Sequence, residues 1–426
     1  MTTSGQPHTG SYYAATVNDQ TEFPSLAGDR SADVCIIGAG FTGISSALHL
    51  AERGYKVCVL DANKVGWGAS GRNGGQMIGG ISGEATMAKA AGADGVAMLW
   101  EMRWAGHEII RERVQSYGID CDLKYGYLDV AIKERHRRDL ERQMETLQAH
   151  RFPHEYRLLS QFETADMLGT ESYIGALQNN GNGHLHPLNL CIGEARAAAT
   201  RGADLYENSA VTHIAHGAKA TVHTTAGSVS ADFVIIAGNA YHLLEKKLRG
   251  LMFPVNSFII GSEPLPESLV QEINRHDLAV CDPNFVLQYF RLSADKRLLF
   301  GGRCNYFGAD PEVIKRNLVP RMLKIYPQLR QVNFEFGWGG TIGVPANRVP
   351  QIGRVAPNVF YAQGYSGHGV NVTHLTGQVL ADAIAGTFER FDLFARIRPL
   401  CIPGTALFGR QMVSLGMLYY GLKDRL

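Results

Sequence analysis

Several features that would place the protein in a special class are missing from its sequence. No apolar run approaches the roughly 18 residues that a membrane-spanning helix needs, and residues 1–10 lack the charged-then-apolar pattern of a secretory signal. Neither charge is in excess, because 41 Lys and Arg residues nearly balance 40 Asp and Glu residues. These absences argue against a transmembrane, a secreted and a nucleic-acid-binding protein. We therefore expect a soluble, cytoplasmic protein.

Cysteine is sparse and scattered. The seven cysteines show neither CxxC spacing nor clustering, and Cys35 and Cys58 fall within apolar runs that predict core strands. We predict reduced thiols rather than disulfides. The alternating His184 and His186 could ligate a metal, but a structural or pocket-wall role is the favoured interpretation, and we predict no metal site.

The strongest motif is a glycine-rich turn that follows an apolar run. Residues 34–37 are typical of a buried parallel strand, and Gly38, Gly40 and Gly43 lie in the turn after it. The first glycine allows a tight turn, and the second lets the backbone approach a pyrophosphate. The third lets the following helix, predicted over 44–53, pack closely on the strand.

A second apolar run, residues 57–60, ends at Asp61. A carboxylate at this place accepts hydrogen bonds from an adenosine ribose and disfavours a 2′-phosphate. Strand, glycine loop, helix, strand and acid all fall within 33–61, so we interpret the segment as a βαβ dinucleotide-binding unit. The residues expected to contact the dinucleotide here are Gly38, Gly40, Phe41, Thr42, Gly43, Asp61 and Ala62.

Two further glycine-rich loops favour FAD over NAD. One follows the ribose-binding acid at 66–75, and the other, at 364–370, follows a predicted strand at 359–362 and opens a helix. Loops with little side-chain bulk can run close to an extended cofactor, and a helix start favours a ring that carries negative charge, as reduced flavin does. The residues expected at the cofactor from these and adjoining segments are Gly68, Ala69, Ser70, Gly71, Arg72, Asn73, Gly75, Gln76, Val211, Gly238, Gly364, Gly367, His368, Gly369 and Val370.

At this point the chain resembles the FAD-dependent oxidoreductases of the D-amino-acid-oxidase superfamily, in the branch named for γ-glutamylputrescine oxidoreductase. The matching strings run nearly end to end: residues 11–15 (SYYAA), 68–76 (GASGRNGGQ), 183–189 (GHLHPLN), 364–370 (GYSGHGV) and 422–426 (LKDRL). The resemblance implies FAD as cofactor and oxidation of a C–N bond. Some relatives tether FAD through His or Cys, but 66–75 contains neither and 338–367 contains no Cys, so we predict dissociable FAD.

The cofactor loops lie near both ends of the chain, so the nucleotide-binding lobe must be discontinuous. The predicted class is α/β (α+β overall): a Rossmann-like FAD-binding domain plus a substrate domain with a mixed or antiparallel sheet and helices. We assign 31–88, 184–240 and 339–426 to the FAD-binding domain, 89–183 and 241–338 to the substrate domain, and 1–30 to an N-terminal extension. Further expected elements are helices at 98–114, 134–149 and 187–200, and strands at 205–211, 233–239, 285–291 and 297–300. The tail 410–426 is expected to dock on the body rather than on a membrane surface.

The expected chemistry is hydride transfer from a carbon next to nitrogen to flavin N5, which gives an imine. It requires a neutral amine, a dry pocket and stabilisation of reduced flavin rather than a catalytic triad. Tyr365 and His368, in the last glycine loop, are the candidate catalytic residues, although His368 could equally be a structural histidine.

Substrate candidates lie in the segment expected to cover the flavin. Tyr289 and Trp338 could contact substrate or fill the core. Related sequences usually continue with glycine where this chain has Arg303, and an arginine there could grip a carboxylate in bidentate fashion, or could lie on the surface. The sarcosine-oxidase-like branch has basic anchors at two places where Met77 and Asn371 stand here, so those anchors are absent, and Met77 is a further candidate for substrate contact.

The substrate therefore remains open between γ-glutamylputrescine and a compact carboxylate-bearing amine such as L-pipecolate, proline or an N-alkyl amino acid. The electron acceptor is oxygen or another molecule. Two alternative functions are a nicotinamide-linked dehydrogenase and a flavin-carrying subunit that only passes electrons.

Overall fold

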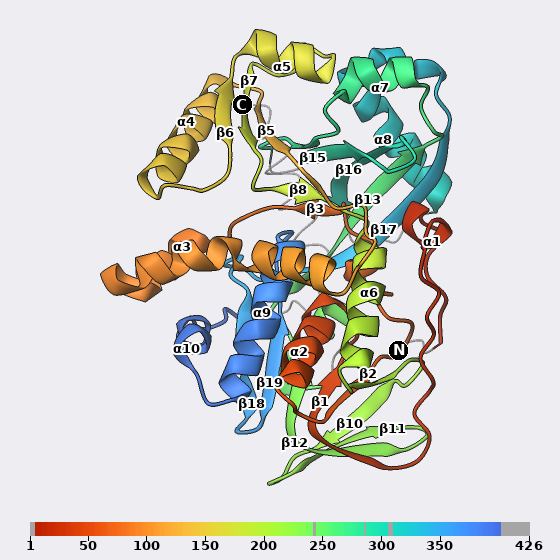
Figure 1. Cartoon of the computed structure of the whole chain (residues 1–426), viewed down its shortest axis with the longest axis vertical. Coiled ribbons are helices and arrows are strands. Elements are labelled where there is room, and N and C mark those ends of the chain that lie inside the picture. The colour runs from red at the N-terminus through yellow and green to blue at the C-terminus, as the bar shows by residue number, and fades with distance from the viewer. Residues whose placement is uncertain (1–4, 242–243, 285–286, 306–309, 402–426) are drawn as a thin grey trace.

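The computed structural model describes residues 5–241, 244–284, 287–305 and 310–401, without the side chains of 93–94 and 303–305. Two eight-stranded sheets form two lobes, one below and one above in Figure 1, with helix α3 (Glu84–Ser116) running beside their junction. The observed architecture is the predicted α/β class. The predicted tail helix at 410–426 lies outside the described residues.

The first sheet contains the predicted βαβ unit. Its path is β10-β11-β12-β1-β2-β9, and β19 pairs with β12 and with β18. Alternate residues of its central strands enter different cores: Val34 and Ile36 join the core beneath the helices, whereas Cys35 and Ile37 join the core of the opposite face. The strands are β1 (Arg30–Ile37), β2 (Val57–Leu60), β9 (Asp204–Tyr206), β10 (Val211–Ala215), β11 (Ala220–Thr224), β12 (Ser228–Ile236), β18 (Gln351–Ala356) and β19 (Val359–Gln363).

Three helices pack together over one face of this sheet. They are α2 (Phe41–Glu52), α6 (Pro187–Thr200) and α9 (Gly369–Ile384), and α2 contacts both of the others. Figure 1 shows α2 and α9 side by side, although more than 300 residues separate them in the chain. Helix α3 also packs on α9, and α10 (Glu389–Ala395) packs on β18.

The second sheet has the order β17-β13-β16-β15-β14-β5-β7-β6. It is mixed, because β14 and β5 run parallel whereas its other pairs are antiparallel. Its strands are β5 (Tyr127–Ala131), β6 (Tyr156–Leu159), β7 (Gly175–Asn179), β13 (Phe253–Ser262), β14 (Ala279–Cys281), β15 (Gln288–Leu292), β16 (Leu298–Asn305) and β17 (Phe334–Val344). The helices around it are α4 (Glu134–Ala149), α5 (Gln161–Leu168), α7 (Glu267–Asn274) and α8 (Pro311–Ile325).

A small third sheet, β3-β8-β4, joins the lobes; its strands are β3 (Gln76–Met77), β4 (Lys124–Tyr125) and β8 (Gly183–His184). The short helical turns are α1 (Tyr12–Ala15), η1 (Ala69–Gly71), η2 (Asn239–Tyr241), η3 (Lys246–Leu248) and η4 (Pro327–Gln331). All five proposed domain boundaries fall inside elements: 30/31 within β1, 88/89 within α3, 183/184 within β8, 240/241 within η2 and 338/339 within β17.

Most expected elements are present, with shifted ends. The helices predicted at 134–149 and 187–200 coincide with α4 and α6, whereas α2 begins at Phe41 instead of residue 44. The expectation of one strand at 205–211 is wrong, because the chain turns between β9 and β10. Asn208 has a φ of 52° in this turn, and the Ser209 N–H donates to the Asp61 carbonyl at 2.6 Å instead of joining a strand ladder.

The N-terminal extension is part of the core rather than an appendage. Tyr12 and Tyr13 are buried, and the Tyr12 hydroxyl donates to Asp295. Tyr13 lies between the lobes: its hydroxyl accepts a hydrogen bond from Arg291 at 3.1 Å, and its ring packs edge-on against Trp338.

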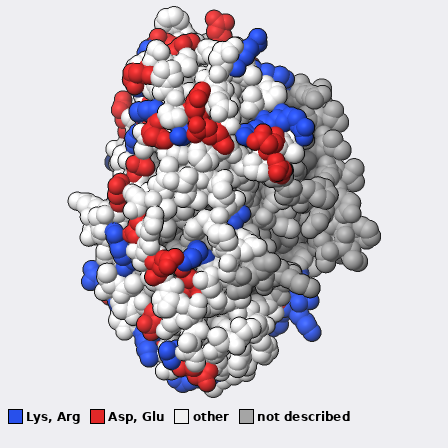
Figure 2. Space-filling model, turned by 90° about the vertical axis from the view of Figure 1, so that its right-hand side faces the viewer, with Lys and Arg blue, Asp and Glu red and all other residues white. Residues whose placement is uncertain are grey.

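Charged side chains are mixed rather than segregated. Figure 2 shows Lys and Arg interspersed with Asp and Glu on the face that it displays, in keeping with the balanced composition. Within the described residues, none of the helices has both the length and the apolar character required to cross a membrane.

We predict that Tyr13→Phe lowers the free energy of unfolding by about 1–3 kcal/mol, because it removes the acceptor of a buried charge-assisted hydrogen bond. The measurement is the unfolding midpoint in denaturant. The matched control is Tyr125→Phe at a tyrosine that is 46% exposed, which should leave the midpoint in place. Equal midpoints for the two variants would show that the Tyr13 contact contributes nothing.

Candidate functional site

The first glycine loop has the geometry of a phosphate cradle at the start of α2. A Cβ on Gly43 would lie 1.8 Å from the Gly38 carbonyl oxygen, so only glycine permits this close packing of helix on strand. Gly38 has a φ of 109°, and a Cβ there would meet Ala237 and Gly238. No side chain caps α2 at Gly40, which leaves N–H groups at its start for an anion.

Asp61 lies at the end of β2 beside this loop. Its carboxylate accepts the Ala39 N–H at 2.6 Å and the Asn63 N–H at 2.8 Å. Burial raises its pKa, although the two N–H groups oppose the change. The turn at Ser209 brings the segment that leads to Val211 against Asp61.

The second glycine loop is attached directly to the first. The Phe41 N–H donates to Ser70 Oγ at 2.9 Å. Asn73 holds the loop closed, because its amide donates to the carbonyls of Ala69 and Ser70 and its Oδ1 accepts the Gly75 N–H. The neighbouring Gln76 side chain instead donates to main-chain carbonyls of the second sheet.

Other members of the second loop pack against fixed neighbours. A Cβ on Gly68 would contact the Tyr241 ring, and one on Gly71 would lie 2.4 Å from the Gly66 carbonyl. The Arg72 guanidinium lies 4.2 Å from the centre of the Trp67 ring, and its Nε donates to the Trp67 carbonyl. Burial lowers the pKa of Arg72.

The third glycine loop meets the first through Tyr365. Its hydroxyl and Thr42 Oγ1 are 2.7 Å apart. Burial raises the pKa of Tyr365, so the phenol stays neutral, and its contact with Thr42 joins the two loops. A Cβ on Gly364 would clash with Pro345, whereas the Cβ positions of Gly367 and Gly369 face open space.

His368 is the residue immediately before α9, and its side chain does not cap the helix. Its Nδ1 is buried without a hydrogen-bond partner among the described residues, as is Ser366 Oγ. Burial, followed by the charge of Arg348, lowers the pKa of His368 below its usual value of 6.5. Unpartnered polar atoms and an uncapped helix start suit a polar ligand at this loop.

Sequence reasoning missed the part that the N-terminal segment plays here. The Gly5 N–H donates to the carbonyl of Ala62 at 3.0 Å, and the Trp67 indole N–H donates to the Pro7 carbonyl at 2.9 Å. Burial and then the charge of Arg72 lower the pKa of His8 to about 4. No periodicity or glycine motif marks these residues in the sequence, so their position depends on tertiary contacts.

Arg291 on β15 was missed as well. It is buried, and its guanidinium donates to the carbonyls of Gly74 at 2.8 Å and Leu185 at 2.8 Å. A Cβ on Gly75 would lie 2.2 Å from the Leu185 carbonyl. Arg291 therefore holds the end of the second glycine loop against the second sheet.

The candidate substrate residues take different places. Tyr289 on β15 faces the second loop, because a Cβ on Gly74 would lie 2.5 Å from its ring. Trp338 is buried and donates its indole N–H to the Arg72 carbonyl at 3.0 Å. Met77 is fully buried in β3. Arg303 belongs to β16, but its side chain lies outside the described part of the structure.

The paired histidines have structural partners. His184 Nε2 is 2.7 Å from the Asp277 carbonyl, and His186 Nδ1 accepts the Asn189 N–H at the start of α6. Across the described residues, no group of three or more His, Cys, Asp or Glu side chains is arranged to hold a metal ion.

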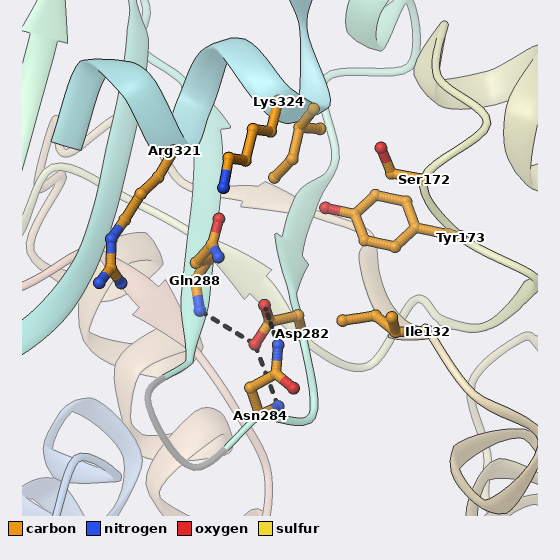
Figure 3. A pocket seen from close by; sticks show the side chains of 9 residues that line it. Ile132, Ser172, Tyr173, Asp282, Asn284, Gln288, Arg321 and Lys324 are labelled. Atoms are coloured by element: carbon orange, nitrogen blue, oxygen red, sulfur yellow. Dashed lines mark hydrogen bonds between the residues drawn. The ribbon is translucent and has the colours of Figure 1, made fainter. Parts of the chain in front are cut away.

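A separate cavity of about 310 Å³ lies beside α8, with none of the predicted cofactor residues in its wall. Figure 3 shows Asp282 within it, bonded to the backbone N–H groups of Gln288 and Asn284. Tyr173, Lys324 and Arg321 also line it. Because its carboxylate already holds two backbone N–H groups of the adjoining turn, Asp282 has a local structural role.

Comparison with known proteins fits this geometry. Residues 33–383 match the family described as "DAO: FAD dependent oxidoreductase". Gamma-glutamylputrescine oxidoreductase of Escherichia coli (strain K12) is 42% identical over 98% of this chain and 99% of its own length. A probable oxidoreductase, OrdL, of Haemophilus influenzae is 39% identical over 99% and 98%.

Among solved structures, glycine oxidase of Geobacillus kaustophilus superposes with a TM-score of 0.72 at 24% identity, over 87% of this chain and 100% of that one. The likeness shows a shared fold. The family match identifies FAD as the cofactor, and the first and third loops, with their uncapped helix starts, have the donor groups that FAD requires. The chain belongs to the DAO family of FAD-dependent oxidoreductases.

Proposed function

We propose that the protein oxidises the C–N bond of an amine to an imine and that a γ-glutamylated diamine is its leading substrate. The observation that supports this substrate is the nearly full-length similarity to gamma-glutamylputrescine oxidoreductase. Bound FAD supplies the two-electron acceptor of the reaction. The proposal includes dissociable FAD, with oxygen or another molecule as the final electron acceptor.

The chain's own residues bind and orient the reactants. The loops at the starts of α2 and α9 are held together by the Thr42–Tyr365 contact. We assign the pyrophosphate to the start of α2 and the flavin ring to the start of α9, where helix ends stabilise a nearby anion by typically 0.3–1 kcal/mol. The second glycine loop and Tyr289 form the facing wall.

We assign the acceptance of the substrate ammonium proton to His368. Its lowered pKa keeps the imidazole neutral at pH 7, and its Nδ1 has no partner among the described residues. A neutral imidazole can take a proton, whereas the Tyr365 phenol, held neutral by burial, cannot. Tyr365 then acts by positioning the loop.

A second candidate is a substrate whose carboxylate lies close to the amine, such as a cyclic imino acid. Arg303 supports it. A Cβ on Gly301 would lie against the Tyr289 hydroxyl, which places Gly301 on the face toward the second glycine loop. Arg303 is two positions further along β16, at a register shift between β13 and β16, and an arginine is well suited to grip a carboxylate in bidentate fashion.

A substrate panel should separate the two candidates. We expect anaerobic flavin bleaching with γ-glutamylputrescine, and we expect Arg303→Met to leave its KM unchanged. If L-pipecolate or proline is the better substrate, Arg303→Met should raise KM for it at least about tenfold, through loss of a charge-assisted hydrogen bond. Arg316→Met, at an exposed arginine on α8, is the control. Failure of every amine in the panel to bleach the flavin would instead favour an electron-transfer subunit.

The proton-acceptor assignment predicts a pH effect. His368→Asn should lower the rate of anaerobic flavin reduction at pH 7 by about 100-fold. In the unmodified enzyme the rate should fall as the pH drops through the His368 pKa, which lies below 6.5, because the protonated ring cannot accept a proton. The variant should lack this acidic limb. His276→Asn, at an exposed histidine, should behave like the unmodified enzyme. A His368→Asn variant that keeps both the rate of flavin reduction and the acidic limb of its pH profile would rule out the assignment.

A further inference from the structure

A fully buried group of charged side chains joins the helices that begin at the glycine loops. Arg113 comes from α3, Glu194 from α6 and His374 from α9, and their residues are 4%, 0% and 0% exposed. Arg113 donates to Glu194 Oε1 at 2.9 Å and to the Ser45 carbonyl on α2 at 3.2 Å. We call Arg113, Glu194 and His374 the buried triad.

The surroundings of His374 determine its protonation state. Its Nδ1 lies 2.5 Å from the Val370 carbonyl oxygen, and its Nε2 lies 3.1 Å from Glu194 Oε2. A carbonyl oxygen can only accept, and an ionised carboxylate likewise only accepts. Because a neutral imidazole carries one N–H, it could satisfy only one of these contacts. A second proton must therefore lie between Nε2 and Oε2.

The neighbours of Glu194 favour its ionised carboxylate. Burial alone would raise the Glu194 pKa, but the charges of His374 and Arg113, with their hydrogen bonds, lower it to about 2. The triad then contains two cations and one anion. Its net charge is +1 wherever the shared proton lies, because the proton count is the same.

The buried histidines and thiols near the triad do not cancel this charge. Burial, followed by positive neighbours, lowers the pKa of His49 to about 2 and that of His107 to about 3, so both rings are neutral at pH 7. Burial raises the pKa of the Cys121 and Cys191 thiols, which are neutral as well. An excess buried charge is costly unless an anion balances it.

The triad adjoins the place where the family's cofactor presents its own negative charge. The His374 ring lies 5.0 Å from the ring of Phe41, the first residue of α2. Ser45, one turn further along α2, donates to the His374 carbonyl at 3.1 Å. The pyrophosphate of a bound dinucleotide lies at the start of this helix.

We propose that His374 is a positioning residue whose buried imidazolium supplies the excess positive charge that balances the FAD pyrophosphate. In the apoprotein the excess positive charge of the triad is unbalanced, and in the holoprotein the pyrophosphate balances it. Protonated His374 therefore strengthens FAD binding and lowers the stability of the apoprotein. The proposal uses the family's cofactor and does not depend on which amine is the substrate.

The first test reads the proton directly. In the holoenzyme labelled with ¹⁵N-histidine at pH 7.5, both ring nitrogens of His374 should show attached protons and the chemical shifts of an imidazolium. Loss of these signals in His374→Gln assigns them. His186 is the internal control: its Nδ1 accepts the Asn189 N–H and its pKa is lowered to about 3, so it should show a neutral ring. A neutral ring at His374 would overturn the proposal.

The second test separates charge balance from simple packing. His374→Gln should weaken FAD binding about tenfold, which is ~1.4 kcal/mol, and should leave the thermal midpoint of the apoprotein unchanged or higher. The FAD-induced rise in midpoint should shrink accordingly. His186→Gln, at a buried neutral histidine, should lower the apo and holo midpoints equally. Equal destabilisation of both forms by His374→Gln, with unchanged FAD affinity, would show that His374 has only a packing role.

Discussion

The structure depends on the meeting of three glycine loops at the start of α2. The first and second loops are joined by the bond from the Phe41 N–H to Ser70 Oγ, and the first and third by the contact of Thr42 with Tyr365. The residues of the second contact are 323 positions apart in the sequence. Because buried polar groups need partners, each loop satisfies donors or acceptors that the others leave open. The discontinuous first lobe, with its helices converging on one face, is what allows the meeting.

This arrangement concentrates positive potential inside a protein with almost no net charge. The starts of α2 and α9, whose N-cap residues make no side-chain cap bond, are joined by the Thr42–Tyr365 contact, and the buried triad contacts α2 at Ser45 and Phe41. Composition does not reveal the effect, because the formal net charge of the chain is +1 and the visible surface mixes both signs. Burial strengthens each of these interactions, since little water is present to screen them. The helix starts and the buried triad both suit a cofactor that carries a pyrophosphate and an electron-accepting ring.

The second lobe restrains the loops as well as covering them. Arg291 bonds the end of the second glycine loop to β15, and Tyr13 from the N-terminal extension accepts one of its N–H groups. Earlier residues of the same segment bond to Ala62, which follows Asp61, and to Trp67. The extension therefore contacts both the first lobe, at Ala62 and Trp67, and the second lobe, at Arg291.

Local sequence determined the βαβ unit, the helices α4 and α6, the FAD cofactor and the family, because glycine spacing and apolar periodicity act over short distances. It did not predict the turn at Asn208, although the polar residues 207–209 interrupt the segment, because the acceptor that fixes the turn, the Asp61 carbonyl, is distant in the sequence. Nor could it pair Glu194 with His374 or Arg291 with Tyr13, whose partners are 180 and 278 residues apart. Charged and polar residues of this kind look like surface residues in a sequence. Only tertiary packing decides which of them lose contact with water and must therefore bond to one another.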